Sequence, residues 1–306
     1  MPDSFKAGYV AIVGRPNVGK STLLNRLLGQ KISIVTPKPQ TTRNRILGIH
    51  TLPGAQILFL DTPGIHRSDQ RFNREMVRAA LRGAAEADLI LWMVDAEAPE
   101  TPDDLLILEE LKGTKAPVFL LINKVDRVVK DLLLPLIDRF KDRLPLQEIV
   151  PLSATAGDNV DRLMALVLRA LPAGQPFYPE DQVTDRSERF LIAELVREQA
   201  FQLLRQELPY AVAVTVEQVR EREGTPAGEG HALVDVGATL YVEKASQKGI
   251  VIGAGGQMLK QIGQRSRREI EALLGRRVNL QLHVKVREGW RKDERALREL
   301  GYLEQG

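Results

Sequence analysis

The sequence predicts an α/β domain with a mostly parallel sheet, followed by a smaller α+β domain. The chain has 306 residues, 43% of them hydrophobic, which is enough for more than one core. The first part alternates short apolar runs with longer helical patterns, as parallel sheets covered by helices do. A segment with three prolines then precedes a different order of elements. We therefore expect a first domain over 1–172, a linker over 173–186 and a second domain over 187–306.

Five apolar runs are expected to form the first sheet, each followed by a polar or glycine-bearing loop. In α/β proteins the loops at the carboxyl ends of such strands carry the chemistry. A helical pattern over 160–171 stops at Pro172, where the linker begins. The expected strands are Tyr9–Val13, Ile57–Leu60, Leu89–Val94, Val118–Ile122 and Ile149–Leu152.

The second domain is expected to follow the order α-β-β-α-α-β. Asp185 and Glu188 have the spacing of a capping box that opens a helix, and Pro209 is expected to end it. A polar, glycine-rich loop over 220–231 joins the first two strands. The remaining expected elements are strands over 210–219 and 232–242, a helical pair over 245–274 interrupted by GAGG, and a half-buried strand over 278–286.

Residues Gly14 to Ser21 read GRPNVGKS, a full match to the phosphate-binding pattern G-x-x-x-x-G-K-[ST] between a strand and a helix. In such a loop the glycines let backbone N–H groups point at phosphates, the lysine meets the β- and γ-phosphates, and the serine hydroxyl binds Mg²⁺. The predicted nucleotide-binding residues of this segment are Gly14, Asn17, Gly19, Lys20, Ser21 and Thr22.

The segment DTPG, Asp61 to Gly64, follows the next expected strand. Asp61 is placed to hold Mg²⁺, and the Gly64 N–H to sense the γ-phosphate. Between the two motifs lies a polar loop in which Thr41 and Thr42 are both available to close onto the metal. Spacing does not rank the two threonines, and we prefer Thr42. We thus predict Ser21, Thr42 and Asp61 as metal ligands, and Lys20, Thr42 and Gly64 as catalytic.

The pattern N-K-x-D, at Asn123 to Asp126, points to guanine. A carboxylate at Asp126 can accept from the N1–H and the exocyclic amine of guanine, a donor pair that adenine lacks. Asn123 can serve the O6 side and brace the phosphate loop, and the stem of Lys124 can cover the base. Ser153 and Ala154, from the tripeptide LSA after the last strand, complete the predicted base pocket through the Ala154 N–H.

Ile65 stands just after the DTPG glycine, where Ras-type enzymes place the glutamine that orients water. Hydrolysis must then use backbone, another loop, a partner or a monovalent cation, and we expect slow turnover. Asn17 could help to hold K⁺ near the phosphates, so K⁺ is a third expected cofactor beside GTP/GDP and Mg²⁺.

The second domain carries VIGAGGQMLKQI, a GxxG loop between two helical patterns, which resembles the KH module. Residues 244–292 hold twelve basic residues against three acidic ones, a balance of +9 in a chain whose net charge is +3, which leaves −6 for the rest. Such a split predicts a phosphate-backbone partner. The predicted RNA-binding residues are Ile252, Gly253, Ala254, Gly255, Gly256, Lys260, Arg265 and Arg268.

Together the motifs resemble the Era family of bacterial GTPases, which join a P-loop GTPase domain to a type II KH domain. The resemblance covers nearly the whole chain, and includes the QTTR loop, NKVD, VIGAGGQMLKQIG and the tail GWRKDERALRELGY. It implies binding to the 3′ region of small-subunit (16S) ribosomal RNA, a role in 30S subunit maturation, and peripheral contact with the inner membrane. The apolar residue at position 65 agrees with the family.

Cysteine is absent and no export signal or membrane-spanning run is visible, so we expect a cytoplasmic protein with inner-membrane contact left open. We also expect a monomer. Two other hypotheses remain. The chain could be a GTPase of RNA modification or of a membrane, whose basic domain only docks, or an RNA-binding module that uses GTP as a structural ligand. The first predicts no preference for ribosomal RNA, and the second predicts no GTP turnover.

Overall fold

The computed structural model describes residues 5–39, 41–65, 86–222 and 233–302. The chain divides into two compact units, each described below by itself. The first comprises Met1–Val35 and Pro39–Asp185, and the second comprises Thr36–Lys38 and Arg186–Gly306. The division falls at the C-terminal end of the predicted linker.

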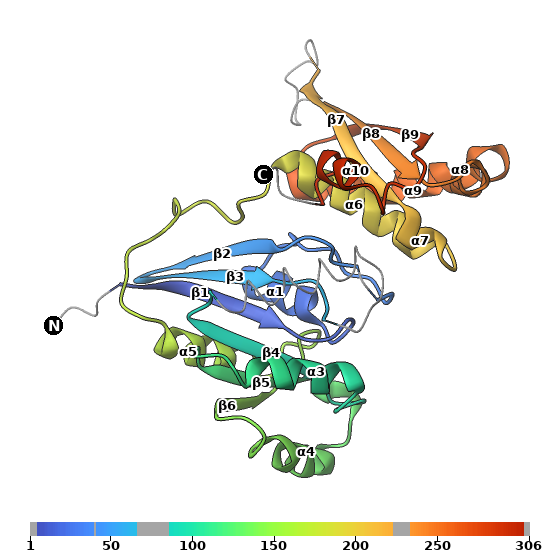
Figure 1. Ribbon diagram of the computed structural model, residues 1–306. Coiled ribbons are helices and arrows are strands. Elements are labelled where there is room, and N and C mark those ends of the chain that lie inside the picture. The colour runs from blue at the N-terminus through green and yellow to red at the C-terminus, as the bar shows by residue number, and fades with distance from the viewer. Residues whose placement is uncertain (1–4, 40, 66–85, 223–232, 303–306) are drawn as a thin grey trace. The chain divides into compact units, whose positions relative to one another are not determined.

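The first unit contains a six-stranded sheet of order β2-β3-β1-β4-β5-β6 (Figure 1). Only the β2–β3 pair is antiparallel, and the other neighbours are parallel. The carboxyl ends of β1, β3, β4 and β5 thus lie at one edge, where the predicted motifs stand. The strands are β1 (Lys6–Val13), β2 (Ile46–Leu52), β3 (Ala55–Asp61), β4 (Leu89–Asp95), β5 (Val118–Asn123) and β6 (Leu146–Pro151).

Helices flank this sheet because each presents one apolar stripe to it. The leucines of α1 pack close to Gly48 in β2, where a side chain would meet Leu24 and Leu28 within 3 Å. Ile107 of α3 and Phe140 of α4 join Trp92 of β4 in one buried cluster. The described helices of this unit are α1 (Lys20–Leu28), α3 (Pro102–Leu111), α4 (Leu133–Phe140) and α5 (Val160–Ala170), with 3₁₀ turns η1 (Val125–Arg127) and η2 (Lys130–Leu132).

The proline-bearing segment after α5 lies against the first sheet instead of hanging free. Gln56, which is fully buried in β3, accepts from the N–H groups of Phe177 and Tyr178 and donates to the Tyr178 carbonyl. The Ile49 N–H of the edge strand β2 donates to the Val183 carbonyl, 2.9 Å away. Residues 173–185 therefore belong to the first unit by their hydrogen bonds, although their composition is that of a linker.

The second unit has a three-stranded sheet of order β7-β8-β9, in which β7–β8 is antiparallel and β8–β9 is parallel. Its core gathers α6, α8 and α9 with one face of the sheet, as the alternate burial of the strands requires. The elements are α6 (Glu188–Leu203), α7 (Leu208–Ala211), β7 (Ala213–Glu221), β8 (Val234–Val242), α8 (Ala245–Ile252), η3 (Ala254–Gly256), α9 (Gln257–Leu274), β9 (Val278–Val286) and α10 (Glu294–Glu299).

The predicted α/β plus α+β fold class is confirmed, with three local corrections. The antiparallel edge strand β2 is not among the predicted strands. Ser187, not Asp185, caps α6, since its side chain accepts from the Phe190 N–H. Pro209 does not end that helix, which stops at Leu203; it lies instead in the first turn of α7. Most of the predicted loop over 220–231 lies outside the described residues.

Candidate nucleotide site and RNA interface

The phosphate loop connects β1 to α1, and its last residue, Gly19, shows why the pattern requires glycine. Gly19 has a φ of 104°, and a Cβ there would lie 2.3 Å from Nδ2 of Asn123. Gly19 is the N-cap of α1, and no side chain caps this helix end. The first N–H groups of α1 therefore keep their hydrogen-bonding capacity for an anion.

Lys20 is folded into the loop that it follows. Its Nζ donates to the carbonyls of Gly14 and Arg15, both at 2.9 Å, and the residue is 6% exposed. Burial lowers the pKa of Lys20 to about 8, and the nearby Asp61 opposes that shift. A buried ammonium held mainly by carbonyls gains strongly from phosphate oxygens.

Three predicted metal-side residues meet in the structure. The Ser21 hydroxyl donates to Oδ2 of Asp61 at 2.7 Å, and it lies 3.0 Å from the Thr42 hydroxyl. With its own proton on Asp61, Ser21 accepts from Thr42. Asp61 is fully buried, and its Oδ1 has no hydrogen-bond partner among the described residues. An orphaned carboxylate oxygen beside two hydroxyls suits the all-oxygen ligation that Mg²⁺ prefers, so these residues fit the metal.

A fourth residue, Ser33, also holds this carboxylate, and the sequence analysis missed it. Its hydroxyl donates to Oδ2 of Asp61 at 2.7 Å, and Ser33 is itself fully buried. Burial raises the pKa of Asp61, while Lys20 and the two serine hydroxyls lower it. Asn25 of α1 fixes the Ser33 backbone with bonds to its N–H and its carbonyl. No motif signals Ser33, since it stands 28 residues before its partner.

Thr42 and Gly64 are the residues predicted for the γ-phosphate side. Thr42 is 7% exposed and lies beside Ser21, which favours it over Thr41 as the metal ligand; Thr41 is 9% exposed. Gly64 lies against the phosphate loop, because a Cβ there would be 2.7 Å from the Pro16 backbone nitrogen. Ile65 is buried in the core, and its N–H donates to the Gly14 carbonyl. Its side chain thus serves packing.

On the base side, Asn123 ties three segments together. Its Nδ2 donates to the Val18 carbonyl at 2.7 Å, and its Oδ1 accepts from the Ala154 N–H at 2.9 Å. The predicted bracing of the phosphate loop by Asn123 is therefore visible. The Ala154 N–H, predicted to serve guanine, is here bonded to Asn123. Asp126 is exposed, and no described residue forms a hydrogen bond or ion pair with its carboxylate.

Ser153 stabilises the loop that carries Ala154. Its hydroxyl accepts from the Ala156 N–H at 2.9 Å, and Ser153 is fully buried. Arg26 of α1 donates to the carbonyls of Ala154 and Thr155 from the other side. The loop is thus anchored to the helix that follows the phosphate loop, a contact between positions more than a hundred residues apart.

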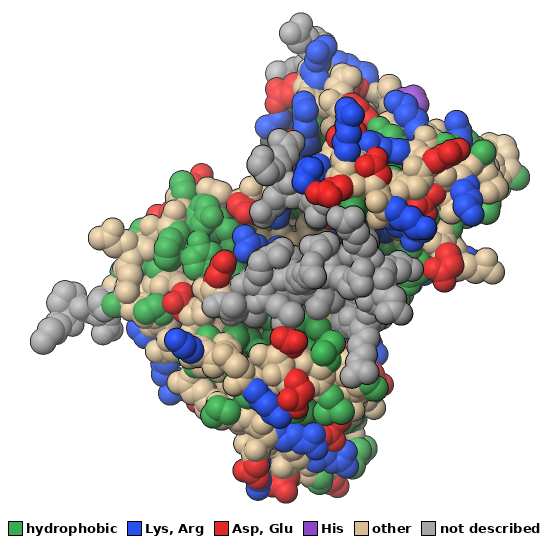
Figure 2. All heavy atoms as spheres, in the orientation of Figure 1, with side chains coloured by type: hydrophobic (Ala, Val, Ile, Leu, Met, Phe, Trp, Pro, Cys, Tyr) green, Lys and Arg blue, Asp and Glu red, His purple; other side chains and the backbone are tan. Residues whose placement is uncertain are grey.

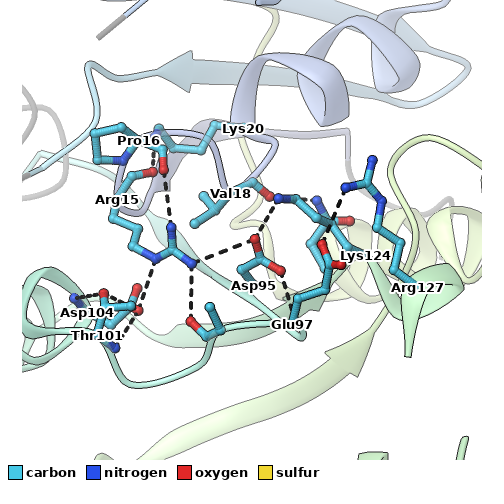
Figure 3. A network of polar contacts seen from close by, with 12 residues as sticks. Arg15, Pro16, Val18, Lys20, Asp95, Glu97, Thr101, Asp104, Lys124 and Arg127 are labelled. Atoms are coloured by element: carbon cyan, nitrogen blue, oxygen red, sulfur yellow. Dashed lines mark hydrogen bonds and ion pairs between the residues drawn. The ribbon is translucent and has the colours of Figure 1, made fainter. Parts of the chain in front are cut away.

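A network of ion pairs beneath the loop was also missed by the sequence analysis (Figure 3). Asp95, the last residue of β4, lies between Arg15 of the phosphate loop and Lys124 of the NKVD motif. Arg15 also pairs with Asp104 of α3. The one available signal was the carboxylate of Asp95 at the end of an apolar strand.

In the second unit, the GxxG loop joins α8 to α9. Gly256 is the N-cap of α9 with a φ of 77°, and again no side chain caps the helix. Ala254 and Gly255 are exposed, and a Cβ at Gly255 or Gly256 would meet nothing within 4 Å. The loop is therefore uncrowded at these two positions. Ile252 is half-buried against the core and Gly253 is half-buried at the C-cap of α8.

The basic residues of this unit fall into two classes. Figure 2 shows Lys and Arg side chains interspersed with carboxylates on its visible face. In the C-terminal segment, Arg287 and Arg295 pair with Glu299, and Arg291 pairs with Glu243. On α9, by contrast, Lys260, Arg265 and Arg268 are exposed, and no described residue forms an ion pair with them. Unneutralised cations after a GxxG loop suit a phosphate backbone.

Each of the two units matches a known protein family. Residues 9–124 match the family described as 50S ribosome-binding GTPase, and residues 207–291 match the KH domain family. The GTPase Era of Geobacter metallireducens is 53% identical over 298 residues, covering 97% of this chain and 98% of that protein. The GTPase Era of Lacticaseibacillus paracasei is 50% identical over 296 residues, with 97% and 96% covered.

The chain belongs to the Era family of GTPases.

Two solved Era structures superpose on the chain with TM-scores of 0.92, at 44% identity, covering 98% of this chain and 100% of the other. One is Era in complex with MgGDPNP and nucleotides 1506–1542 of 16S ribosomal RNA, and the other is an Aquifex aeolicus Era variant bound to GDP and AlF4⁻. The predicted family, the two-part fold and the GTPase activity are thereby confirmed. No helix within the described ranges is long and apolar enough to cross a membrane.

Proposed function

We propose that this Era-family GTPase is a molecular switch that binds the 3′ region of 16S ribosomal RNA through its KH domain and assists 30S subunit maturation. The observation that carries the proposal is full-length similarity. An Era structure that matches 98% of this chain with a TM-score of 0.92 holds both a GTP analogue with Mg²⁺ and that RNA. The similarity extends over the phosphate loop, the NKVD motif and the GxxG loop alike.

In this proposal GTP and GDP occupy the loop between β1 and α1. Lys20 leaves its two carbonyl partners to meet the β- and γ-phosphates, and the N–H groups of α1 face the phosphates. Ser21, Thr42 and Asp61 would hold Mg²⁺, and Asp61 would offer it the oxygen that has no partner among the described residues. Bound Mg²⁺ neutralises charge between the phosphates. The Gly64 N–H would donate a hydrogen bond to the γ-phosphate and so respond to its presence or loss.

The proposed base recognition uses Asp126 for the two guanine donors and the stem of Lys124 for the base face. Asn123 braces the phosphate loop, which supports its assignment as the link between the two ends of the nucleotide. Ser153 stabilises the loop that carries Ala154. When guanine binds, the Ala154 N–H would donate to the guanine oxygen instead of to Oδ1 of Asn123. Asn17, whose φ is 65°, belongs to the proposal as a residue that helps to hold K⁺.

The proposed RNA interface is the GxxG loop with the adjacent face of α9. Gly253 to Gly256 let the RNA backbone approach, and the N-terminus of α9 points at its phosphates. Lys260, Arg265 and Arg268 add positive charge, and Ile252 borders the groove for unpaired bases. A monomeric state and peripheral inner-membrane contact belong to the proposal on the family resemblance alone.

The test measures RNA binding and GTP turnover on the same preparation. Fluorescence anisotropy is recorded with a short RNA that matches the 3′ end of 16S ribosomal RNA, with a scrambled RNA of equal composition as control. Binding is measured with GDP, with a non-hydrolysable GTP analogue and without nucleotide, beside phosphate release. We expect preference for the 16S sequence, a dependence on the nucleotide, and slow GTP hydrolysis.

The outcomes also separate the two other hypotheses. Equal affinity for the matched and scrambled RNA would favour a GTPase whose basic domain only docks. RNA binding with no phosphate release would favour a module that keeps GTP as a structural ligand. Either result would overturn the proposed function.

A further inference from the structure

The network beneath the phosphate loop contains a carboxylate, Asp95, that touches both halves of the nucleotide site. Asp95 ends β4 and stands beside Asn123, the last residue of β5, in the parallel register. The residue after Asn123 is Lys124, so the sheet itself brings the carboxylate next to the NKVD motif. Asp95 is 5% exposed.

Both oxygens of this carboxylate are in use. Oδ1 accepts from the Glu97 N–H at 3.0 Å, which fixes the orientation of the side chain. Oδ2 lies 2.5 Å from Nζ of Lys124 and 3.6 Å from Nη2 of Arg15 (Figure 3). A single buried acid thus faces the cation proposed to cover the base and a cation of the phosphate loop.

Arg15 is held from a second direction. Its Nε donates to Oδ2 of Asp104 at 3.2 Å, and its Nη2 donates to the Ala98 carbonyl at 3.1 Å. Asp104 is 1% exposed and fixed in turn by the capping box with Thr101 at the start of α3. The Arg15 carbonyl is one of the two that hold Lys20. The segment from Asp95 to Asp104 therefore holds Arg15 at three points.

We propose that Asp95 is a positioning residue that couples the phosphate loop to the guanine motif, so that both ends of the nucleotide meet preorganised partners. This coupling rests on the nucleotide site proposed above. Among the described residues, the side-chain hydrogen bonds and ion pairs of Asp95 reach Glu97, Lys124 and Arg15, and not Lys20, Thr42 or Gly64. Its loss should therefore weaken GTP and GDP binding by the same factor and leave kcat nearly unchanged.

The test uses Asp95→Asn in the full chain, because asparagine keeps an oxygen for the Glu97 N–H and removes the charge. Affinities for mant-labelled GDP and a mant-labelled GTP analogue are measured with dissociation rates, kcat, KM and thermal unfolding. We expect both affinities to fall about tenfold, equivalent to about 1.4 kcal/mol, with faster dissociation and a kcat within about twofold of the original.

A double-mutant cycle with Lys124→Ala shows whether the effect runs through the base-side cation. In a chain that already carries Lys124→Ala, Asp95→Asn should lower nucleotide affinity by less than about a further twofold. This remaining loss is the smaller share of the effect, which runs through Arg15. Arg15→Gln, measured alone, is a second variant for the phosphate half and should also weaken both nucleotides. Arg127→Gln is the matched control: its pair with Glu97 belongs to the same network but is 56% and 44% exposed, and should change nothing.

Unchanged affinity for both nucleotides in folded Asp95→Asn, or full additivity with Lys124→Ala, would overturn the coupling. A general loss of stability without the split between KM and kcat would do the same, since it would make Asp95 a structural residue only. Failure of the unaltered chain to bind labelled GDP is a different result, which would refute the nucleotide site itself.

Discussion

The two glycine-rich loops of this chain begin helices in the same way but leave different space above them. Gly19 and Gly256 are both left-handed N-caps, and neither helix has a side-chain cap. A Cβ at Gly19 would collide with Asn123, whereas a Cβ at Gly256 would meet nothing within 4 Å. The first loop is closed by its neighbours, and the second is open.

The charged side chains near the first loop are buried, and those near the second loop are exposed. Lys20 and Asp61 are buried and held by internal partners, while Lys260, Arg265 and Arg268 are exposed. A closed cradle with fixed charges suits one small ligand in one pose, because preorganisation lowers the cost of binding. An open loop with exposed cations suits a polymer whose phosphates recur along its length. The same local device can therefore serve two kinds of phosphate ligand.

The largest expected effect comes from closing the first loop further. Gly19→Ala should reduce GTP and GDP affinity by at least about a hundredfold, since it combines a positive φ with a clash against Asn123. Gly255→Ala is the matched variant, with a φ of 57° but open space, and should lower RNA affinity only a few-fold. Titration with labelled GDP and with RNA checks both. Similar losses in the two variants would remove the contrast between the loops.

Base specificity should change almost as strongly. Asp126→Asn should weaken GTP binding about a hundredfold and improve XTP binding, because the new amide can donate to the 2-oxo group of xanthine. Competition between GTP and XTP for labelled GDP measures the switch, and RNA affinity serves as the internal control. A variant that still prefers GTP as the original chain does would refute the base-side assignment.

Substitutions in the second loop should abolish its function and leave that of the first loop intact. Replacing Ala254 and Gly255 by Asp puts two carboxylates where a phosphate backbone must approach, so RNA affinity should fall about tenfold or more. Both positions are exposed, so folding should be little changed, and basal GTP hydrolysis should stay near that of the original chain. RNA anisotropy and phosphate release on the same samples test this.

Any RNA-dependent change in GTP hydrolysis should vanish in that double variant, since coupling needs a ligand that distinguishes two states. Undiminished RNA affinity in a folded protein would contradict the KH assignment and leave the basic segment as an unspecific patch. The thermal unfolding midpoint separates this outcome from a folding defect.

The smallest expected effect concerns K⁺. If Asn17 helps to hold the cation beside the phosphates, GTP turnover should be a few-fold faster in KCl than in NaCl, and Asn17→Ala should erase the difference. Nucleotide affinity in NaCl is the control. Equal rates of the original chain in both salts would contradict a role for K⁺.

Local patterns were enough to predict the loops themselves, because each motif is a contiguous run between a strand and a helix. They predicted β9 with its full bounds, since its apolar residues alternate cleanly. The first four residues of β2 are all buried, so alternation gave no signal there. The spacing of Asp185 and Glu188 predicted the wrong cap for α6, because the hydrogen bond that forms the cap runs from the Phe190 N–H to Ser187.

Contacts between distant positions lay beyond sequence reasoning. Arg15 meets Asp104 across 89 positions, and Arg26 meets Ala154 across 128. Such pairs depend on the order of strands in the sheet, which no local window contains. Ser21 lies beside Asp61, and Asn123 lies beside Ala154, because parallel strands bring their carboxyl ends to one edge. Their supports, Asp95 and Ser33, carry no motif.

The hydrogen bonds that join residues 173–185 to the first sheet decide where a stable GTPase fragment can end. β2 is an edge strand, and an uncovered edge is a template for pairing with another chain. A fragment that stopped at residue 172 would strip the Val183 carbonyl from that edge and leave the buried amide of Gln56 without Phe177 and Tyr178. An isolated GTPase fragment should therefore aggregate when cut at 172 and remain dispersed when it extends through residue 185.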